Sequence, residues 1–386
     1  MIEGTLASML EPLERFEDIR RRHVRLGPHL CDLAYANPYS GVQEAARAAL
    51  RRALDAERTL DLQYTPFGGQ AVARRVTADA LRTGHGLPFT HDDVVLTPGA
   101  MAALHVALHT SAAPGAEVVV PTPCWLDHPL FARACGLTPV AVGMAPPRFD
   151  LPVDAIAAAV GERTRAVLLS HPANPTGRLY DDADLAALGA VLADAERRYG
   201  TTITLIADET HRDFCAPGAF RTPALHHDRT VIVYSFGKYH FLQGQRIGYA
   251  AVSPRHPGRE AAAREMVRWT RVLGFATPTA LMQRALPELL RLRHDLSWLD
   301  LWRKRYVEEL TDAGYEVVPP DATLFVYVRT PRDAPDDYSF TERLAAAGVL
   351  VLPGPAFHHE GWFRLALTGS EPMLERALPI LAGAAR

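Results

Sequence analysis

The sequence predicts an α/β fold, with a large domain built on a mostly parallel, doubly covered sheet and a smaller α/β domain at the C-terminus. Between about residues 90 and 252, short β-branched runs alternate with alanine-rich helical stretches. This alternation is typical of βαβ units around a parallel sheet. Residues 258–312 are mostly helical in pattern, and a second, shorter α/β set follows them.

Seven strand-like runs define the large domain: DDVVLTP, AEVVVPTP, TPVAVGM, TRAVLLSHP, TITLIADE, RTVIVYSFG and RIGYAAVS. Before them, the first 30 residues are helical in pattern, with a helix start expected at Pro12, and residues 41–58 have an amphipathic helical pattern. The small domain is predicted from YEVVPP, TLFVYVR, FTERLAAAG, VLVLPG, WFRLALT and a last helix from Met373. We place the large domain at residues 46–284, and we assign residues 1–45 and 285–386 to an N-terminal segment and the small domain.

Composition excludes several classes of partner. The chain has 386 residues, with 41 basic and 44 acidic side chains and a net charge of −3. Nucleic acid or an anionic membrane would require a basic face, so neither is expected as a partner. No apolar run reaches the roughly 18 residues of a membrane span, and the N-terminus lacks a signal-peptide core. The four cysteines have no metal-finger spacing, which favours a reducing, cytoplasmic location.

Lysine is almost absent from this sequence. Only Lys238 and Lys304 are lysines, and the other 39 of the 41 basic residues are arginines. Arginine cannot replace lysine where the amine must lose its proton and act as a nucleophile. A retained lysine is therefore a candidate for chemistry, although chance retention is an equal alternative. Lys304 lies in a charged helical pattern, which indicates an exposed face.

Several polar residues follow predicted strands, where the loops of a parallel sheet form the ligand crevice. Each also has a structural explanation: Asp208 could cap a helix, Asn174 begins a turn motif, and Trp125 could be a core aromatic. The backbone of Gly99, Ala100 and Met101, at a strand–glycine–helix turn, could bind a phosphate. The segment SFGKYHFLQGQRIGY places Ser235, Lys238 and Arg246 within twelve residues.

Together these motifs resemble the fold-type-I pyridoxal-phosphate (PLP) enzymes, specifically the class I/II aminotransferase-like family, over about residues 30–386. The family pattern S-x-x-K-x5-G-x-R-x-G is matched by Ser235, Lys238, Gly244, Arg246 and Gly248. The asparagine of N-P-x-G resembles Asn174, the aspartate of D-E resembles Asp208, and the tyrosine of Y-x-x-x-G resembles Tyr64. The late arginine of WFRLAL resembles the family arginine at Arg364.

The resemblance implies PLP as the cofactor and a role for each matched residue. Lys238 would form the internal aldimine and then move a proton as general base and acid. Asp208 would keep the pyridine nitrogen protonated, Asn174 would bond the ring oxygen O3′, and Trp125 would stack on the ring. Arg364 would bind the substrate α-carboxylate. The phosphate would be held by Gly99, Ala100, Met101, Ser235, Arg246 and the neighbouring subunit's Tyr64.

Three positions depart from the family pattern. His211 stands where a tyrosine usually bonds O3′; we expect it to bond O3′ and to influence titration of the cofactor linkage, or else to be a packed histidine. Ala36, in YANP, replaces a glycine that faces the substrate, and its methyl group is expected to reshape the pocket. After Lys238 the chain has Tyr239, His240 and Phe241. His240, Gln243 and Cys124 are either pocket residues or structural ones.

The leading interpretation is an aminotransferase that moves the α-amino group of an L-amino acid to a 2-oxo acid through the Lys238 aldimine. The first alternative is a PLP-dependent lyase or synthase that eliminates, replaces or cyclises an amino acid or a sulfonium amino acid. A non-catalytic homologue is a weaker alternative, and a nicotinamide-dependent enzyme lacks its G-x-G-x-x-G motif. The family resemblance also implies a homodimer with shared active sites.

Overall fold

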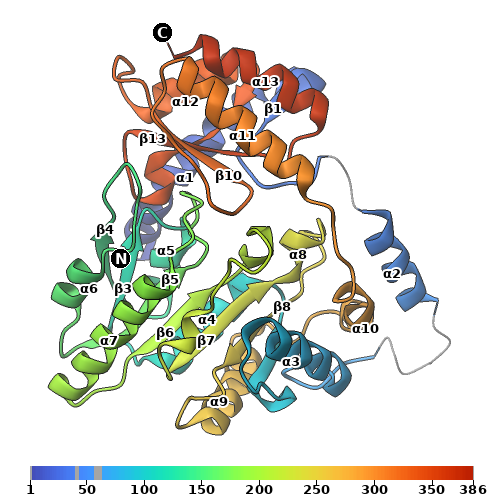
Figure 1. Cartoon of the computed structure of the whole chain (residues 1–386), viewed down its shortest axis with the longest axis vertical. Coiled ribbons are helices and arrows are strands. Elements are labelled where there is room, and N and C mark those ends of the chain that lie inside the picture. The colour runs from blue at the N-terminus through green and yellow to red at the C-terminus, as the bar shows by residue number, and fades with distance from the viewer. Residues whose placement is uncertain (1, 40–42, 56–62, 386) are drawn as a thin grey trace.

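The computed structural model describes residues 2–39, 43–55 and 63–385. Its largest sheet has seven strands and lies in the lower part of Figure 1, below the C-terminal elements. The strand order is β2-β8-β7-β6-β5-β3-β4. Strand β8 is antiparallel to β2 and β7, and all other neighbours pair in parallel, which confirms the mostly parallel sheet. The strands are β2 (Val94–Thr97), β3 (Glu117–Thr122), β4 (Thr138–Gly143), β5 (Thr164–Ser170), β6 (Thr204–Asp208), β7 (Thr230–Ser235) and β8 (Gly248–Val252).

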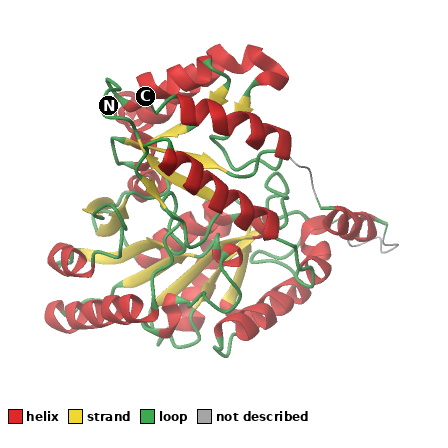
Figure 2. Cartoon of the chain, turned by 45° about the horizontal axis from the view of Figure 1, so that its top comes forward, coloured by secondary structure: helices red, strands yellow, loops and turns green. Residues whose placement is uncertain are grey.

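Both faces of this sheet are covered because its strands are apolar on both sides. Along β5, Val167 and Leu169 pack into a core with α7, whereas Ala166 and Leu168 pack into a core with α4 on the opposite face. Figure 2 shows these strands running between helices. The large-sheet helices are α3 (Ala71–His85), α4 (Ala100–Ser111), α5 (Asp127–Ala134), α6 (Val153–Ala159), α7 (Asp182–Tyr199), α8 (Phe236–Tyr239), α9 (Arg259–Val272) and α10 (Ala280–Leu289).

A second core surrounds two smaller sheets near the C-terminus. An antiparallel sheet has the order β12-β13-β10-β9, and β1 pairs in parallel with β11. The strands are β1 (Cys31–Asp32), β9 (Val317–Val318), β10 (Phe325–Arg329), β11 (Val349–Leu350), β12 (Leu352–Pro353) and β13 (Trp362–Ala366). The remaining helices are α1 (Ile2–His23), α2 (Glu44–Leu54), α11 (Ser297–Asp312), α12 (Asp337–Ala346) and α13 (Glu371–Gly383). Helix α1 packs against α12, so the chain's beginning joins the small domain.

Two local expectations need comment. Pro12 lies inside α1 rather than at a helix start, and its carbonyl accepts a hydrogen bond from Tyr338 at 3.1 Å. Tertiary packing against α12 therefore outweighs the helix-breaking tendency of proline.

The helix expected over 41–58 is α2, while 40–42 and 56–62 lie outside the described residues. The domain boundaries stay a prediction, and both fall within helices, α2 and α10. Among the described residues, no helix has the length and apolarity of a membrane span.

Candidate active site

The site forms where three parallel strands end side by side. Ser170 at the end of β5 pairs with Asp208 at the end of β6, and Asp208 pairs with Val233 near the end of β7. Because β8 runs in the opposite direction, its first residue lies at this same edge, where Gly248 pairs with both Ser235 and Thr97. Residues far apart in the chain thus meet at one edge.

Lys238 lies on α8, directly after β7, and its side chain is half-buried. Burial, followed by the positive charges of Arg364 and Arg246, lowers the pKa of Lys238 to about 8, and Asp208 only partly opposes this. The neutral amine is therefore accessible near neutral pH. Lys304, in contrast, is exposed on α11 and pairs with Glu308 at 3.9 Å.

Asp208 is buried and has two partners. Its Oδ2 lies 3.2 Å from Nε2 of His128, and its Oδ1 accepts hydrogen bonds from the Thr210 backbone and hydroxyl at 3.1 and 2.5 Å. Burial alone would raise the pKa of Asp208, but the bond and charge of His128, with Thr210, lower it below its ordinary value. The carboxylate is thus ionised and pre-oriented.

His128 is a functional candidate that sequence reasoning missed. It lies on the first turn of α5, three residues after Trp125, and it is fully buried. A histidine three residues after a predicted ring-stacking aromatic is a usable signal, because the turn that opens α5, closed by a bond from His128 N–H to the Trp125 carbonyl at 3.0 Å, keeps the two residues close. Its contact with Asp208 depends on how α5 crosses the end of β6, however, and no local pattern shows that crossing.

His211 is buried and lies three residues after Asp208, the last residue of β6. One of its ring nitrogens has no partner in the described part of the chain. Its Nε2 has no hydrogen-bond partner among the described residues, and its ring packs edge-on against Phe325 at 5.3 Å. Burial, followed by the charge of Lys238, lowers the pKa of His211 to about 3. The imidazole is therefore neutral at pH 6.5.

Arg364 is 1% exposed on β13 and lies between the two sheets. Its Nη1 donates to Asn174 Oδ1 at 3.0 Å and its Nη2 donates to the Ala34 carbonyl at 2.7 Å, while Nε has no partner. Its guanidinium lies 3.9 Å from the ring centre of Phe325 and 5.9 Å from that of Trp125. Burial lowers the pKa of Arg364 to about 9, and no carboxylate among the described residues pairs with it. The guanidinium is thus a buried cation that can accept the carboxylate of a ligand as its partner.

An anion-binding cradle forms at the N-terminus of α4. Gly99, the N-cap, has a φ of 88° and makes no side-chain cap, so the first-turn N–H groups of Ala100 and Met101 are available. A Cβ at Gly99 would lie 2.6 Å from Nη2 of Arg246, so only glycine lets the guanidinium lie this close. Ser235 is adjacent, because its pairing partner Gly248 packs against the backbone of Gly99.

The remaining sequence-predicted residues occupy different places. Ala36 is buried, and its carbonyl accepts a hydrogen bond from Gln243 at 3.0 Å, which joins the segment after Lys238 to the N-terminal segment. His240 contacts Nε2 of His294 through Nδ1 at 2.9 Å, an arrangement with a structural role. Cys124 is buried, and burial raises its pKa well above the usual range. Tyr64 is fully exposed and does not join the other site residues within this chain.

These residues fit PLP, which presents a pyridine nitrogen, a ring oxygen, an aldehyde and a phosphate dianion. An ionised Asp208 suits the nitrogen, and the unsatisfied Nε2 of His211 suits the oxygen. The amine of Lys238 suits the aldehyde. The uncapped helix start with Arg246 suits the phosphate, as helix N-termini and guanidinium groups do in general.

Comparisons with known proteins agree with this arrangement. A family model described as aminotransferase class I and II matches residues 29–381. A probable aspartate/prephenate aminotransferase of Thermus aquaticus is 29% identical over 369 residues, 93% of this chain and 92% of that protein. A mutant aspartate aminotransferase of Thermus thermophilus superimposes with a TM-score of 0.84 at 27% identity over 96% of each chain. A Eubacterium rectale aminotransferase, at 24% identity, shows the fold alone, with a TM-score of 0.88 over 96% of this chain and 94% of that one. This chain therefore belongs to the class I and II aminotransferase family and is an enzyme that uses PLP.

Proposed function

We propose that this enzyme moves the α-amino group of an L-amino acid to a 2-oxo acid, with Lys238 as the residue that carries PLP and transfers the proton. The observation that supports this role is the position of Lys238 at the sheet edge among Arg364, Arg246 and Asp208. Burial and the two arginines lower its pKa to about 8, which makes it a nucleophile near neutral pH.

The neighbouring residues would bind and orient the cofactor and the substrate. PLP, when bound, supplies an electron sink for the electrons released at the substrate Cα. Asp208 would accept a hydrogen bond from the pyridine nitrogen. Because Oδ1 of Asn174 already accepts from Arg364, its amide N–H groups are left to donate to the ring oxygen, together with Nε2 of His211. Trp125 would cover one face of the ring.

Arg364 would bind the substrate's α-carboxylate, because it is a buried cation with no carboxylate partner and a free Nε donor. A two-pronged contact to this carboxylate would orient the Cα–H bond toward the amine of Lys238. Lys238 would then accept the proton from Cα and return it on the cofactor side as general acid.

The names of relatives suggest which amino donors and acceptors to test. Thermus relatives carry names that include aspartate and prephenate, and an Escherichia coli relative, 29% identical over 76% of this chain and 76% of its own, is named methionine aminotransferase. We propose aspartate and methionine as the first donors to test, and prephenate, itself a 2-oxo acid, as the first acceptor. Arg268 pairs with Glu265 at 3.0 Å and Arg271 lies over Phe67, so neither supports an acidic side chain in the pocket.

No observation favours elimination or cyclisation over amino transfer. Of the departures from the family pattern, His240 contacts His294, and Gln243 donates a hydrogen bond to the carbonyl of Ala36. Both contacts have structural roles, which leaves Ala36 and His211 as the departures at the site itself.

We also propose a homodimer with shared sites in the cytoplasm. Tyr64 is fully exposed, and Phe67, Met101 and Val272 are exposed apolar side chains on the same segment, on α4 and on the neighbouring end of α9. An apolar face of this kind fits a two-fold interface, which would bring Tyr64 to the partner's phosphate. The four cysteines, all among the described residues, are free thiols, as a reducing compartment would leave them.

The test is the amino-transfer half-reaction, followed by absorbance for each proposed donor and reversed by a 2-oxo acid. Lys238→Ala should lower turnover by more than about 1000-fold, since general acid–base catalysis contributes about 10²–10⁴-fold. Lys304→Ala, which removes an exposed lysine, should leave turnover unchanged. Borohydride reduction with peptide mapping should place the cofactor's mass on Lys238. An active Lys238→Ala protein, or products of elimination, would contradict the proposal.

A further inference from the structure

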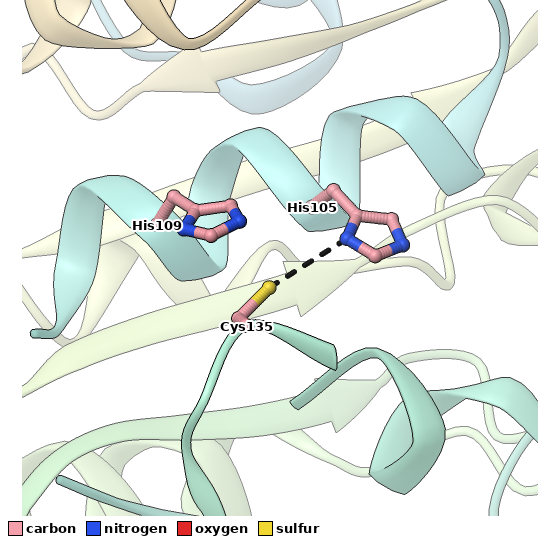
Figure 3. Close-up of side chains that lie close together, drawn as sticks. All are labelled: His105, His109 and Cys135. Carbon is pink, nitrogen blue, oxygen red and sulfur yellow. Dashed lines mark hydrogen bonds between the residues drawn. The ribbon is translucent and has the colours of Figure 1, made fainter. Parts of the chain in front are cut away.

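Outside the PLP site, three metal-ligating side chains converge in the gap between two helices of the large domain. His105 and His109 lie on α4, and Cys135 follows the last residue of α5 (Figure 3). One ligand atom from each lies within 4.8 Å of the others, and His105 Nδ1 is 3.6 Å from the Cys135 sulfur. None of the three belongs to the candidate active site.

Local structure explains why these side chains meet. Residues four apart on a helix share one face, so both imidazoles of α4 point the same way. Cys135 is held at the end of α5 by backbone hydrogen bonds to Phe131 and Ala132 at 3.0 and 3.2 Å. Helix α5 packs against α4, and the short distance between the sulfur and His105 follows from this packing.

Aromatic side chains pack against both imidazole rings. Trp269 stacks on His109 with 4.3 Å between ring centres and 18° between planes, and Phe131 lies 4.4 Å from the ring centre of His105. Apart from the contact between His105 and Cys135, neither imidazole has a hydrogen-bond partner among the described residues. His105 Nδ1 thus contacts only the Cys135 sulfur, and His109 has no hydrogen-bond partner among the described residues, which leaves both imidazoles able to coordinate a metal ion.

The donor set and its spacing select the metal. Two imidazoles and one thiolate, without a carboxylate, suit zinc and exclude magnesium and calcium, which prefer oxygen ligands. A tetrahedral zinc ion with nitrogen at about 2.0–2.1 Å and sulfur at about 2.3 Å holds the two atoms about 3.6 Å apart. The observed distance of 3.6 Å between His105 and Cys135 is compatible with this geometry. The ligand atoms of the whole cluster lie within 4.8 Å of one another, so the cluster has to contract around the ion, with rotation of the His109 side chain.

We propose that His105, His109 and Cys135 bind a zinc ion, with water in the fourth position. On binding, the Cys135 thiol releases its proton to solvent and the sulfur coordinates as thiolate. Both histidines are half-buried, so water reaches the ion from one side. The ion would tie α4, whose first turn follows Gly99, to α5, which begins two residues after Trp125. We therefore expect zinc to raise the thermal stability of the holoenzyme and to slow its loss of PLP.

The experiment measures zinc and cobalt binding to PLP-loaded protein that has been stripped of metal and kept reduced. Elemental analysis should give about one zinc per chain, and competition with a chromophoric chelator gives the affinity. Cobalt(II) should produce the d–d bands of a tetrahedral site with a thiolate ligand, in the red region where PLP does not absorb. Cys135→Ser and His109→Gln should each weaken binding by at least about 100-fold, since even outer partners of metal ligands contribute 10- to 100-fold.

Matched controls are Cys215→Ser, a cysteine outside the cluster, and His91→Gln, an exposed histidine. Both should bind zinc as the unaltered protein does. Circular dichroism and PLP absorbance show whether each variant is folded, and the zinc-dependent rise in melting temperature should disappear only in the cluster variants. Zinc bound equally by Cys135→Ser, cobalt spectra without thiolate ligation, or no binding at all would overturn the proposal. Each outcome is independent of the role of Lys238 in amino transfer.

Discussion

In the role proposed for Lys238, its amine has to lose a proton before it attacks the aldehyde of PLP, so pH should control how fast the PLP-free protein takes up its cofactor. Burial and the charges of Arg364 and Arg246 lower the pKa of Lys238 to about 8. Below that pH the charged amine dominates, so the uptake rate should rise with pH and level off above about 8. Stopped-flow absorbance from about pH 6 to about pH 10 measures this rate.

A rate that continues to rise toward pH 10, as an ordinary lysine with a pKa near 10.4 would give, would contradict this assignment. The neighbouring cations provide an internal check. Arg364→Met removes one positive charge beside the amine, so the midpoint of the same pH profile should move upward.

Arg364 should select substrates by their α-carboxylate. Arg364→Lys keeps the charge but loses the planar fork, so kcat/KM for amino-acid donors should fall about 10- to 100-fold, because a hydrogen bond to a charged group contributes about 1.5–3 kcal/mol. An amine without the carboxylate should react equally with both proteins. Arg329→Lys, which alters an exposed arginine paired with Glu316 at 2.8 Å, serves as the control. An equal loss of kcat/KM for the amino acid and for the amine without a carboxylate would indicate a structural role for Arg364.

His211 should lower the pH at which the bound cofactor titrates. Its neutral ring can donate from Nε2, and a donor to the ring oxygen stabilises the oxygen's negative charge. His211→Phe removes the donor, so the midpoint of the holoenzyme's absorbance titration should move to higher pH. His211→Tyr restores a donor and should return the midpoint toward its original value. An unchanged midpoint in the phenylalanine variant would show that His211 does not contact the ring oxygen.

The start of α4 is shaped by one glycine. A Cβ at Gly99 would lie only 2.6 Å from Nη2 of Arg246 and would push the guanidinium away. The φ of +88° at Gly99 also disfavours any residue with a side chain. Gly99→Ala should therefore weaken PLP binding and also cost about 1–3 kcal/mol of stability, because a φ of 88° with a ψ of 176° is essentially restricted to glycine. Gly115 has a φ of +90° with open space around it, so Gly115→Ala carries a positive-φ backbone cost without the clash. Equilibrium dialysis should show weaker PLP binding by the Gly99→Ala protein than by the Gly115→Ala protein. Equal affinities of the two variants for PLP would argue against a phosphate site at Gly99.

The strand ends of the site could be predicted because the hydrophobic pattern locates where each strand stops. Asp208, Ser235 and Asn174 each follow a β-branched run, and parallel strands bring such ends to one edge. The contact between His128 and Asp208 joins residues 80 apart, and the bond from Gln243 to Ala36 joins residues 207 apart. These pairings depend on how whole elements cross, and no local pattern carries that information.

The fold of the chain was predictable in class and in order of elements, whereas the course of α1 was not. The expected helix start at Pro12 was wrong because packing of α1 against α12 holds a continuous helix through the proline. The sequence also does not indicate that β8 lies between β2 and β7 in the antiparallel direction, because its hydrophobic pattern is that of any buried strand. A reversed strand changes which residues share the functional edge, and the pairing of Gly248 with Ser235 and Thr97 follows from it.

Assembly should complete each site. Tyr64 is fully exposed in the single chain, so its hydroxyl is free to reach a neighbouring subunit's phosphate. Tyr64→Phe should weaken PLP binding without changing the mass of the dimer measured by sedimentation. Mixing Tyr64→Ala with Lys238→Ala chains should give hybrids with one unaltered site each, so activity at limiting PLP should return. Activity that stays absent in verified hybrids would show that each chain uses its own tyrosine.

Arg364 connects parts of the chain that are remote in sequence. Through Asn174 and Ala34 it spans separations of 190 and 330 residues, and it lies on the small sheet while Asn174 lies at the edge of the large one. A ligand carboxylate bound to Arg364 would therefore stabilise the contact between the small sheet and the edge of the large sheet. Substitutions far from Lys238 that change the orientation of the small sheet relative to the large one should first weaken the binding of carboxylate inhibitors, before the protein loses its fold.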